Sequence, residues 1–463
     1  MFGATMPQPS GTPELARRLG VFDATMIVMG GIVGAGIFIN PYVVAQQVHT
    51  PALILGAWAA GGLIALAGAF VYAELAQLRP QVGGQYAYLR DAFHPMVAFL
   101  YGWGLLLVTQ TGGMAAVAVT FANYFRELTG TGVSPAVLAV SALAVLTVIN
   151  CLGVRSGSNV QSALMVTKIV AVLALVAIGW TAARAPSHPY LPPVGSAQKP
   201  VPIAFAAAMV PVLFAYGGWQ TSSFVSGELK NPARDLPRGL LIGVAGVILL
   251  YLAVNVVCLH ALGPDGLAAT QTPASAVMQK ALGSTGAKLI AAGIAVSTIG
   301  FLSQGMLTAP RVYYAMARDG VFFKSVGWLD PRSRVPTVAI ALQGVWAAVI
   351  ALSGRYDQIL NYVVSMDAVF FGLTGAALLV LRRRANRDGE GSSGMGTVTM
   401  RMPGHPWTTL AFVVAFWSLA LSTIIQFPAA SGVGVLIMVA GAPVYWLWAR
   451  KRPSGGAGNG RGA

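Results

Sequence analysis

The sequence has 463 residues, of which 56% are hydrophobic and only 9% are charged. A soluble globular domain has about 25% charged residues, so this composition excludes a soluble protein and predicts a polytopic membrane protein. A formal net charge of +15 suggests nucleic-acid binding at first sight. An excess of Lys and Arg in loops on one side of a membrane explains the charge better.

Apolar segments long enough to cross a bilayer follow one another along the chain, since about 20 residues suffice. We predict an all-α integral membrane protein with twelve transmembrane helices, at roughly 19–45, 52–78, 94–125, 132–151, 158–182, 203–226, 239–262, 286–312, 336–353, 358–381, 408–428 and 431–449. Residues 1–18 and 450–463 are predicted to form tails. The charged, Gly/Ser-rich stretch 382–406 is typical of a flexible loop.

Lys and Arg residues are distributed unequally between the two ends of these helices. With the N-terminus inside the cell, 22 of them fall in inner segments and six fall in outer loops. Cytoplasmic loops are enriched in Lys and Arg. Both termini are therefore predicted to be cytoplasmic, with the helices in the inner (plasma) membrane and no nucleic-acid partner.

The first apolar segment is interrupted at residues 30–41, whose sequence is GGIVGAGIFINP. Each glycine costs roughly 1 kcal/mol relative to alanine inside a helix, and glycine allows the backbone to leave helical geometry. Unwound backbone at membrane depth persists only where it is buried in protein or lines a wet cavity. We therefore interpret residues 31–36 as a break in a membrane helix that lines a binding site.

A second apolar segment, residues 205–227, is interrupted by the sequence YGGW at residues 216–219. Two glycine-broken helices at corresponding positions of two halves are the best sequence indication of a transporter's substrate site. The alternative is that the glycines only permit close packing of helices, as small residues often do in membranes. The two breaks together favour the binding site.

Two charged residues are predicted to lie near the middle of the bilayer, where a charge costs at least ~2.5–3.5 kcal/mol. Lys168 is interpreted either as a fixed cation that braces the first break or as a group that gains and loses a proton. The alternative interpretation is that the Lys168 side chain extends to the membrane–water interface and has no function in the bilayer interior. Asp367 is interpreted either as a contact for a polar or cationic substrate group, as a proton carrier, or as a structural carboxylate bonded to neighbouring hydroxyls.

Three further features concern the ends of the helices. Glu74, near the inner end of the second helix, is expected to form an ion pair with Arg79. Residues 81–93 are amphipathic and are predicted to lie along the inner membrane interface. The two cysteines, Cys151 and Cys258, are predicted at opposite faces, so no disulfide within the chain and no metal site are expected.

Several motifs together resemble the amino acid–polyamine–organocation superfamily. Residues 31–38, GIVGAGIF, are similar to its first-helix signature. Four motifs resemble its L-type amino acid transporter branch: YAEL at 72–75, GGQYAY at 83–88, FAYGGW at 214–219 and ELKNP at 228–232. The resemblance extends from about Leu19 to Trp448, and the combination is specific although no single motif is.

The resemblance implies a five-plus-five inverted repeat, with residues 19–182 forming the first repeat and residues 203–381 the second. Helices 1 and 6 are the broken ones, and two extra helices lie at 408–449. It also implies a secondary transporter that works by alternating access around an amino acid site near the midplane of the membrane.

The resemblance further implies which groups bind the substrate. Its carboxylate meets the backbone N–H groups of Gly34, Ala35 and Gly36, in agreement with the attraction of a helix N-terminus for an anion. Its ammonium meets the carbonyl groups of Ile32, Phe214, Ala215 and Gly217. Phe214 covers the site as a gate.

A coupling function is implied for Lys168, which matches a fifth-helix lysine that replaces a sodium ion near Ser297 and Thr298. Transport without sodium follows from this match. Tyr251 matches a seventh-helix tyrosine that supports the lysine. Judged from the residues alone, the two hydroxyls could equally bond to their own helix.

The chain departs from the family pattern at three places. Ala35 stands where Ser is frequent, which removes one hydroxyl donor to the carboxylate. The outer loop after the third helix has no cysteine, with which animal relatives bind an ancillary glycoprotein. The chain therefore resembles prokaryotic members, and no disulfide-linked subunit is expected. Asp367 stands where relatives usually lack an acid, which argues against a purely apolar side-chain pocket.

These observations predict a sodium-independent exchanger or uniporter of neutral L-amino acids that needs no cofactor and no metal. The alternatives are a proton-coupled importer and a transporter of polar or cationic amino acids or polyamines. An ion channel would need a continuous polar pore or a carbonyl filter, and an enzyme would need a catalytic set. The sequence shows neither feature.

Overall fold

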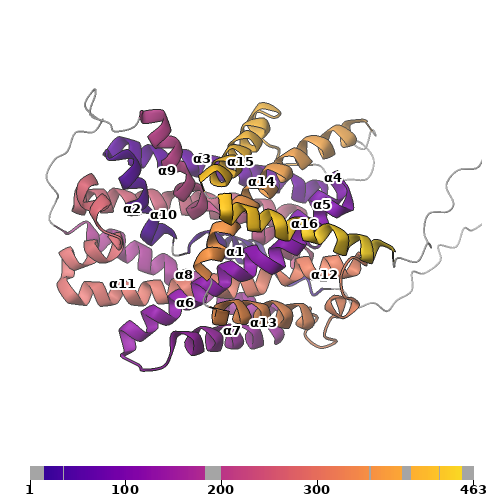
Figure 1. Cartoon of the computed structure of the whole chain (residues 1–463), viewed down its shortest axis with the longest axis horizontal. Coiled ribbons are helices and arrows are strands. Elements are labelled where there is room, and N and C mark those ends of the chain that lie inside the picture. Colours follow the sequence, from indigo (N-terminus) through magenta and orange to yellow (C-terminus); the bar gives the residue numbers. More distant parts are fainter. Residues whose placement is uncertain are drawn as a thin grey trace, which may run out of the picture.

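The computed structural model describes residues 15–34, 36–182, 200–353, 356–387, 398–426 and 428–450. Throughout these ranges the chain is almost entirely helical, as predicted. Figure 1 shows the longer helices gathered into one bundle, with α8 and α11 side by side along its long axis.

The helices follow the predicted segments closely. The first five segments correspond to α1 (Val21–Ile32) with α2 (Gly36–Val48), α3 (Pro51–Leu78), α5 (Pro95–Gly104) with η1 (Leu105–Thr109) and α6 (Gln110–Thr129), α7 (Pro135–Cys151) and α8 (Val154–Gly179). The next five correspond to α9 (Val201–Tyr216) with η2 (Trp219–Glu228), α10 (Pro232–Ala269), α11 (Pro273–Thr308) with α12 (Pro310–Arg318), α13 (Thr337–Ser353) and α14 (Tyr356–Arg387). The chain ends with α15 (Trp407–Gln426) and α16 (Pro428–Arg450), and two short helices lie in connections, α4 (Gln85–Ala92) and η3 (Lys324–Gly327).

Local sequence explains where several helices begin. Proline occupies the first turn of α3, α5, α7, α10 and α11, where its missing N–H leaves no helical bond unmade. The N-cap Ser134 accepts a hydrogen bond from the backbone N–H of Val137 at the start of α7. Gly283 lies inside α11 with φ 65°, so residues 273–282 form a separate helical piece bent away from the rest.

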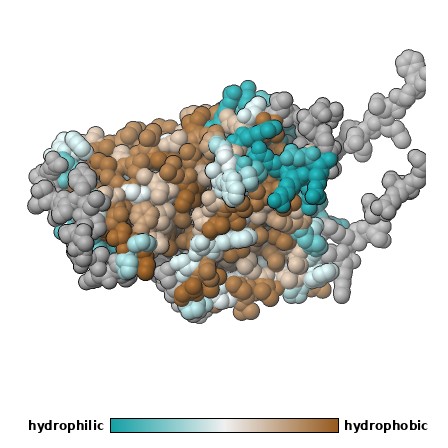
Figure 2. All heavy atoms as spheres, turned by 90° about the horizontal axis from the view of Figure 1, so that it is seen from above, coloured by the Kyte–Doolittle hydropathy of each residue, from teal (hydrophilic) through white to brown (hydrophobic). Residues whose placement is uncertain are grey.

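Eight helices of the described residues are long and apolar enough to cross a membrane, or nine if α1 and α2 form one bent crossing. Helices α7 and α13 are also apolar but have only 17 residues each. Figure 2 shows apolar surface over most of the bundle and hydrophilic surface gathered toward one end. The chain is therefore a multi-span membrane protein, while the count of twelve and the inverted repeat stay predictions.

The hydrophilic end of the bundle, which we call the basic end, contains a backbone connection between distant segments. Leu19 and Leu229 pair as a parallel bridge, and the N–H groups of Arg18 and Leu19 both donate to the carbonyl of Glu228. The Glu228 carboxylate forms an ion pair with Arg311 of α12 at 2.9 Å, with both side chains at most 1% exposed. The chain entering α1 is thus fixed to the chain leaving η2.

The predicted ion pair between Glu74 and Arg79 is wrong. Its carboxylate lies 3.5 Å from Arg382 of α14 and accepts a hydrogen bond from the N–H of Met402 at 2.7 Å. Arg79 instead faces Asp91 at 3.4 Å. The sequence could not show this, because the partners come from segments hundreds of residues away.

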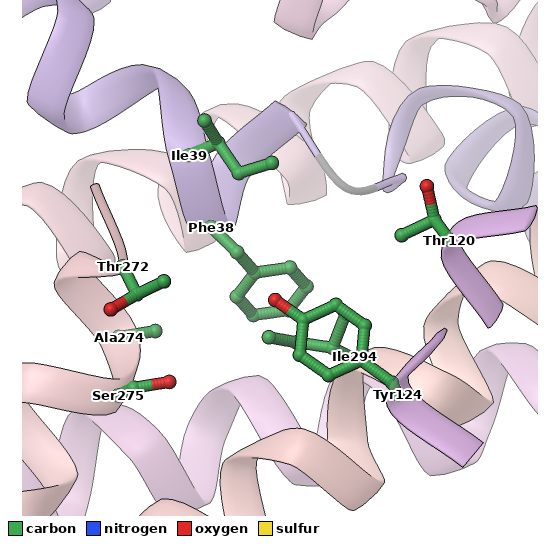
Figure 3. A pocket seen from close by; sticks show the side chains of 8 residues that line it. All are labelled: Phe38, Ile39, Thr120, Tyr124, Thr272, Ala274, Ser275 and Ile294. Carbon is green, nitrogen blue, oxygen red and sulfur yellow. The ribbon is translucent and has the colours of Figure 1, made fainter. Parts of the chain in front are cut away.

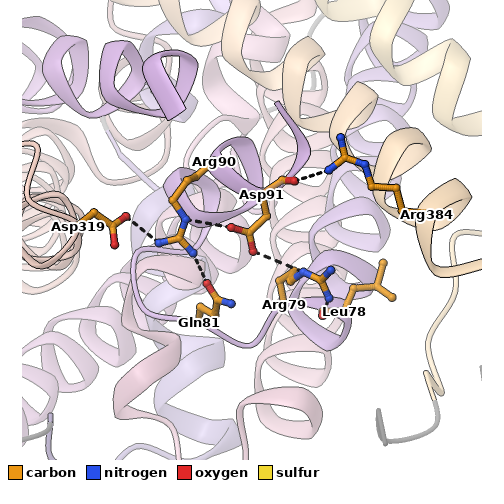
Figure 4. A network of polar contacts seen from close by, with 7 residues as sticks. All are labelled: Leu78, Arg79, Gln81, Arg90, Asp91, Asp319 and Arg384. Atoms are coloured by element: carbon orange, nitrogen blue, oxygen red, sulfur yellow. Dashed lines mark hydrogen bonds and ion pairs between the residues drawn. The ribbon is translucent and has the colours of Figure 1, made fainter. Parts of the chain in front are cut away.

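The amphipathic stretch does form a helix, α4, while its predicted position along the inner membrane interface stays a prediction. Gln85, Tyr86, Tyr88 and Leu89 are at most 1% exposed and pack inside the bundle. Figure 4 shows the polar side of α4 bound to three other elements through Asp319, Arg79 and Arg384. The helix therefore joins parts of the bundle. Cys151 and Cys258 are both free cysteines in the structure.

Candidate functional site

The first break separates α1 from α2 inside the bundle. α1 ends at Ile32, and Val33 leaves helical geometry with φ −74° and ψ 92°. The axes of the two helices differ by 44°. Residues 24–32 are all buried, so α1 brings the break to the protein interior.

The second break lies between α9 and η2. Gly217 follows the last residue of α9 with an extended backbone, and Gly218 has φ 115°. This left-handed region favours glycine, because a Cβ would be strained there. The N–H of Gly218 donates to Oε1 of Gln220 at 3.0 Å, which satisfies one donor that the broken helix leaves free.

The two breaks touch each other through glycine backbone. A Cβ on Gly31 would lie 2.6 Å from the carbonyl oxygen of Gly218, and a Cβ on Gly218 would lie 2.1 Å from the carbonyl oxygen of Gly31. Neither side tolerates a side chain at these distances. The contact therefore requires glycine on both broken helices.

Lys168 reaches the first break from α8. Its Nζ donates a hydrogen bond to the carbonyl of Val33 at 2.6 Å, and the side chain is 1% exposed. A Cβ on Gly300 of α11 would lie 2.6 Å from Cε of Lys168, so glycine provides the space that the lysine fills. The alternative that Lys168 reaches back to the interface is excluded. The acceptor, Val33, is the first residue of the first break.

Tyr251 of α10 bridges the two breaks. Its hydroxyl lies 3.0 Å from the carbonyl oxygen of Ile32 and 3.2 Å from that of Ala215. The single hydroxyl proton is shared between these acceptors. The ring is buried against Trp58 and Tyr216, which fixes the position of the hydroxyl.

The family model described as amino acid permease matches residues 19–448, nearly the whole chain. The chain belongs to the amino acid permease family. The resemblance to the amino acid–polyamine–organocation superfamily is thereby confirmed.

Three relatives illustrate where the permease lies within this superfamily. It is 29% identical to the serine/threonine exchanger SteT of Bacillus subtilis, over 95% of this chain and 98% of that protein. It is 29% identical to large neutral amino acids transporter small subunit 2 of Homo sapiens, over 94% of this chain and 81% of that protein. It is 30% identical to b(0,+)-type amino acid transporter 1 of Oryctolagus cuniculus, over 80% of this chain and 77% of that protein. These relatives are transporters, which confirms both the L-type resemblance and the prediction that the chain is not an enzyme.

The predicted carboxylate site of the permease lies at the start of α2. Gly36 begins this helix and lies against α9, because a Cβ there would be 3.3 Å from Cα of Ala215. A Cβ on Gly34 would meet only the ring of Phe301, at 3.6 Å. Ala35 lies outside the described residues. The binding function of all three positions stays a prediction.

Three of the four carbonyl groups of the predicted ammonium site already have hydrogen-bond partners within the permease. Ile32 and Ala215 accept from Tyr251, and the carbonyl of Phe214 accepts from the N–H of Gly217 at 3.1 Å. A carbonyl oxygen has two lone pairs, so each can accept a second hydrogen bond. The Phe214 side chain is 44% exposed, and its function as a gate stays a prediction.

The predicted hydroxyl partners of Lys168 are not bonded to it. Thr298 donates to the carbonyl of Ala295 in its own helix at 2.7 Å. The hydroxyl of Ser297 is buried and has no hydrogen-bond partner among the described residues. Both lie within a turn of Gly300, which contacts the lysine.

Two glutamines contribute to the breaks and were not predicted. Nε2 of Gln304 lies 2.5 Å from Oγ1 of Thr221, which donates to the carbonyl of Gly218 at 2.7 Å. The side-chain nitrogen of Gln161 would lie 1.9 Å from a Cβ on Gly30. These polar groups surround the unwound backbone from α8 and α11.

A sequence signal for these glutamines exists. Gln161 lies seven residues before Lys168, and Gln304 lies seven residues after Ser297. A separation of seven residues is about two helical turns, which places each pair on one face of its helix. Polar residues at this spacing on otherwise apolar helices indicate a polar face directed at the site.

Asp367 lies on α14, one turn before a residue that contacts the second break. Phe371, one turn further along, stacks on Trp219 at the start of η2, with ring centroids 5.1 Å apart. Within the described ranges, no three His, Cys, Asp or Glu side chains are arranged to hold a metal ion.

A small pocket adjoins α2 on the side of the break away from the basic end. Figure 3 shows Phe38 and Ile39 of α2 facing hydroxyl side chains of α6 and of the region where α11 begins. The lining is completed by Thr120, Tyr124, Thr272, Ala274, Ser275 and Ile294. Any movement of α2 at the first break therefore changes this pocket.

The contact between the breaks gives a prediction about two glycines. Gly218→Ala places a residue with a Cβ in the left-handed region, at about 1–3 kcal/mol, and drives that Cβ into the Gly31 carbonyl. We expect a clear loss of thermal stability in purified protein. Gly34→Ala is the control, because its Cβ makes only ordinary contact with Phe301. Equal unfolding temperatures for the two variants would contradict the observed contact.

Proposed function

We propose that this permease carries neutral L-amino acids across the inner (plasma) membrane by alternating access, as an exchanger or a uniporter, without sodium. The relatives named for serine/threonine exchange and for large neutral amino acids support this substrate class. The proposed site lies where the two broken helices meet, because half-helix ends and unwound carbonyls can take both charged ends of an amino acid.

The single observation that carries sodium independence is the hydrogen bond from Lys168 to Val33. The ammonium is buried and lies 2.6 Å from a carbonyl of the unwound backbone. A cation covalently attached to α8 cannot dissociate into solution. In this proposal it performs the task that a bound sodium ion would perform, and each transport cycle breaks and remakes its bond to the first break.

The proposed architecture has twelve transmembrane helices, with residues 19–182 and 203–381 as inverted repeats and 408–449 as two additional helices. Both termini are cytoplasmic. Support for the repeat comes from the occurrence of one glycine break in each half. Support for the orientation comes from the basic residues, which gather at the end where Arg311 and Arg384 lie.

In this proposal the substrate carboxylate binds the backbone N–H groups of Gly34, Ala35 and Gly36. The ammonium binds the second lone pairs of the carbonyls shared with Tyr251. In this proposal the permease needs no cofactor and no disulfide-linked subunit. The match to 98% of a bacterial relative, the serine/threonine exchanger, supports the comparison with prokaryotic members.

A second candidate function rests on Asp367. Asp367 lies one turn before Phe371, which stacks on Trp219 of the second break, and among the described residues no cation forms an ion pair with its carboxylate. Such a group can carry a proton or bind a polar or cationic substrate group. This favours a proton-coupled importer or a transporter of polar or cationic amino acids or polyamines.

Replacing sodium with choline tests the proposal in proteoliposomes. We expect wild-type flux of neutral amino acids to be unchanged. Lys168→Ala leaves the Val33 carbonyl without its described partner, at about 1–3 kcal/mol. If this cost falls on turnover, flux decreases about 5- to 150-fold with little change in KM.

Lys280→Ala is the matched control, because Lys280 also donates to a backbone carbonyl, that of Ala261 at 2.7 Å, but far from the breaks. Its flux should equal that of the wild type. Strong sodium dependence of the wild type would refute the proposal, as would unchanged flux in Lys168→Ala.

Substituting Asp367 separates the two candidate functions. If the carboxylate contacts substrate side chains, Asp367→Asn shifts preference away from polar or cationic amino acids. If it carries a proton, the same variant loses the pH dependence of uptake. Competition assays and uptake at several pH values measure both. Unchanged substrate and pH profiles would leave Asp367 as a structural carboxylate.

A further inference from the structure

A group of basic side chains surrounds the segment that leads into α15, at the basic end. Residues 398–402 lie along the end of α3, where Oε1 of Gln77 accepts from the N–H groups of Thr399 and Met400. Met402 donates to Glu74, which also pairs with Arg382 of α14. This places Arg401, the residue before Met402, beside the end of α14.

The guanidinium groups of this cluster are incompletely paired. Arg382 shares the buried Glu74 carboxylate at 3.5 Å, and its Nη1 has no hydrogen-bond partner among the described residues. Arg383 and Arg401 are exposed, and neither takes part in an ion pair with any described acidic side chain. Among the described residues, only Arg382 of these three arginines pairs with a carboxylate, so the excess positive charge is available to an anion.

His405 gives independent information about this cluster. Burial lowers the pKa of His405, and the nearby Arg382 and Arg383 guanidinium groups lower it further, while Glu74 raises it. Its Nδ1 lies 3.0 Å from Oγ1 of Thr409 in the first turn of α15. This contact joins the segment that follows Met402 to the first turn of α15.

An apolar stripe begins at the same place. Trp407, the first residue of α15, is 78% exposed. Further exposed apolar side chains follow at helical spacing, namely Leu410, Val414, Trp417, Leu421 and Ile425. Tryptophan is enriched at the level of lipid headgroups, and an exposed apolar stripe on a membrane helix faces acyl chains.

We propose that this surface binds the headgroup of an anionic phospholipid. The phosphodiester lies against the guanidinium groups of Arg383 and Arg401, Trp407 lies at the headgroup level, and the acyl chains follow the exposed stripe of α15. The basic cluster is complementary in charge to an anion, and it continues directly into the apolar stripe. A soluble anion would contact only the basic cluster, so the two features together favour a lipid. Basic clusters next to membrane helices recognise anionic lipids in this way.

The test measures thermal unfolding of the purified full-length chain during titration with phosphatidylglycerol or phosphatidylcholine. We expect a stabilisation that saturates with phosphatidylglycerol alone. In the double variant Arg383→Gln/Arg401→Gln, the half-saturating concentration should rise about 30-fold, or about fivefold for each charge removed. Its unfolding temperature in phosphatidylcholine should match that of the wild type.

The matched control is Arg126→Gln/Lys288→Gln, which removes two exposed cations in α6 and α11, away from this cluster. It should titrate like the wild type. An equal loss in this control would show that only net charge matters and would overturn the proposal. A separate titration with inorganic phosphate tests whether a free anion is sufficient. If millimolar phosphate alone reproduces the stabilisation, the ligand is a free anion and the lipid site is refuted.

Discussion

The structure depends on the close contact of two unwound backbone segments, at Gly31 and Gly218, inside a membrane bundle. Carbonyl groups freed by a helix break have no water to bind at this depth, so each must find a partner in the protein. Tyr251, Lys168 and Thr221 supply those partners from three different helices. Their side chains explain why the breaks persist although each costs helical hydrogen bonds.

The connections around the breaks divide the broken helices into two pairs. At the basic end, the chain entering α1 is bonded to Glu228 at the end of η2. On the other side of the breaks, Nδ2 of Asn40 in α2 donates to the carbonyl of Pro211 in α9 at 2.8 Å. Each pair can therefore move as a unit, with the glycines as joints between them. Alternating access requires movement of this kind, which supports the proposed function.

Much of the fold and part of the site could be predicted from the sequence. Glycine and proline interrupt apolar segments visibly, so the helices, both breaks and the burial of Lys168 followed from pattern alone. Contacts between distant segments could not be predicted in this way, because no local pattern specifies them. Glu74 therefore received the wrong partner, and the burial of the aromatic side chains of α4 inside the bundle was not predicted. Gln161 and Gln304 were missed because an uncharged glutamine is less conspicuous in an apolar helix than a charged residue. Their seven-residue spacing from Lys168 and Ser297 nevertheless indicated that each lies on the same helix face as that residue.

Hydrogen–deuterium exchange in the Tyr251→Phe variant tests most directly whether the two breaks hold each other. Phenylalanine retains the ring packing but removes the hydroxyl shared by the carbonyls of Ile32 and Ala215. If the breaks are joined through this hydroxyl, backbone amides in both residues 29–37 and residues 212–220 should exchange faster than in the wild type, while those of α13 stay unchanged. Faster exchange in only one of the two segments, or in neither, would contradict the account.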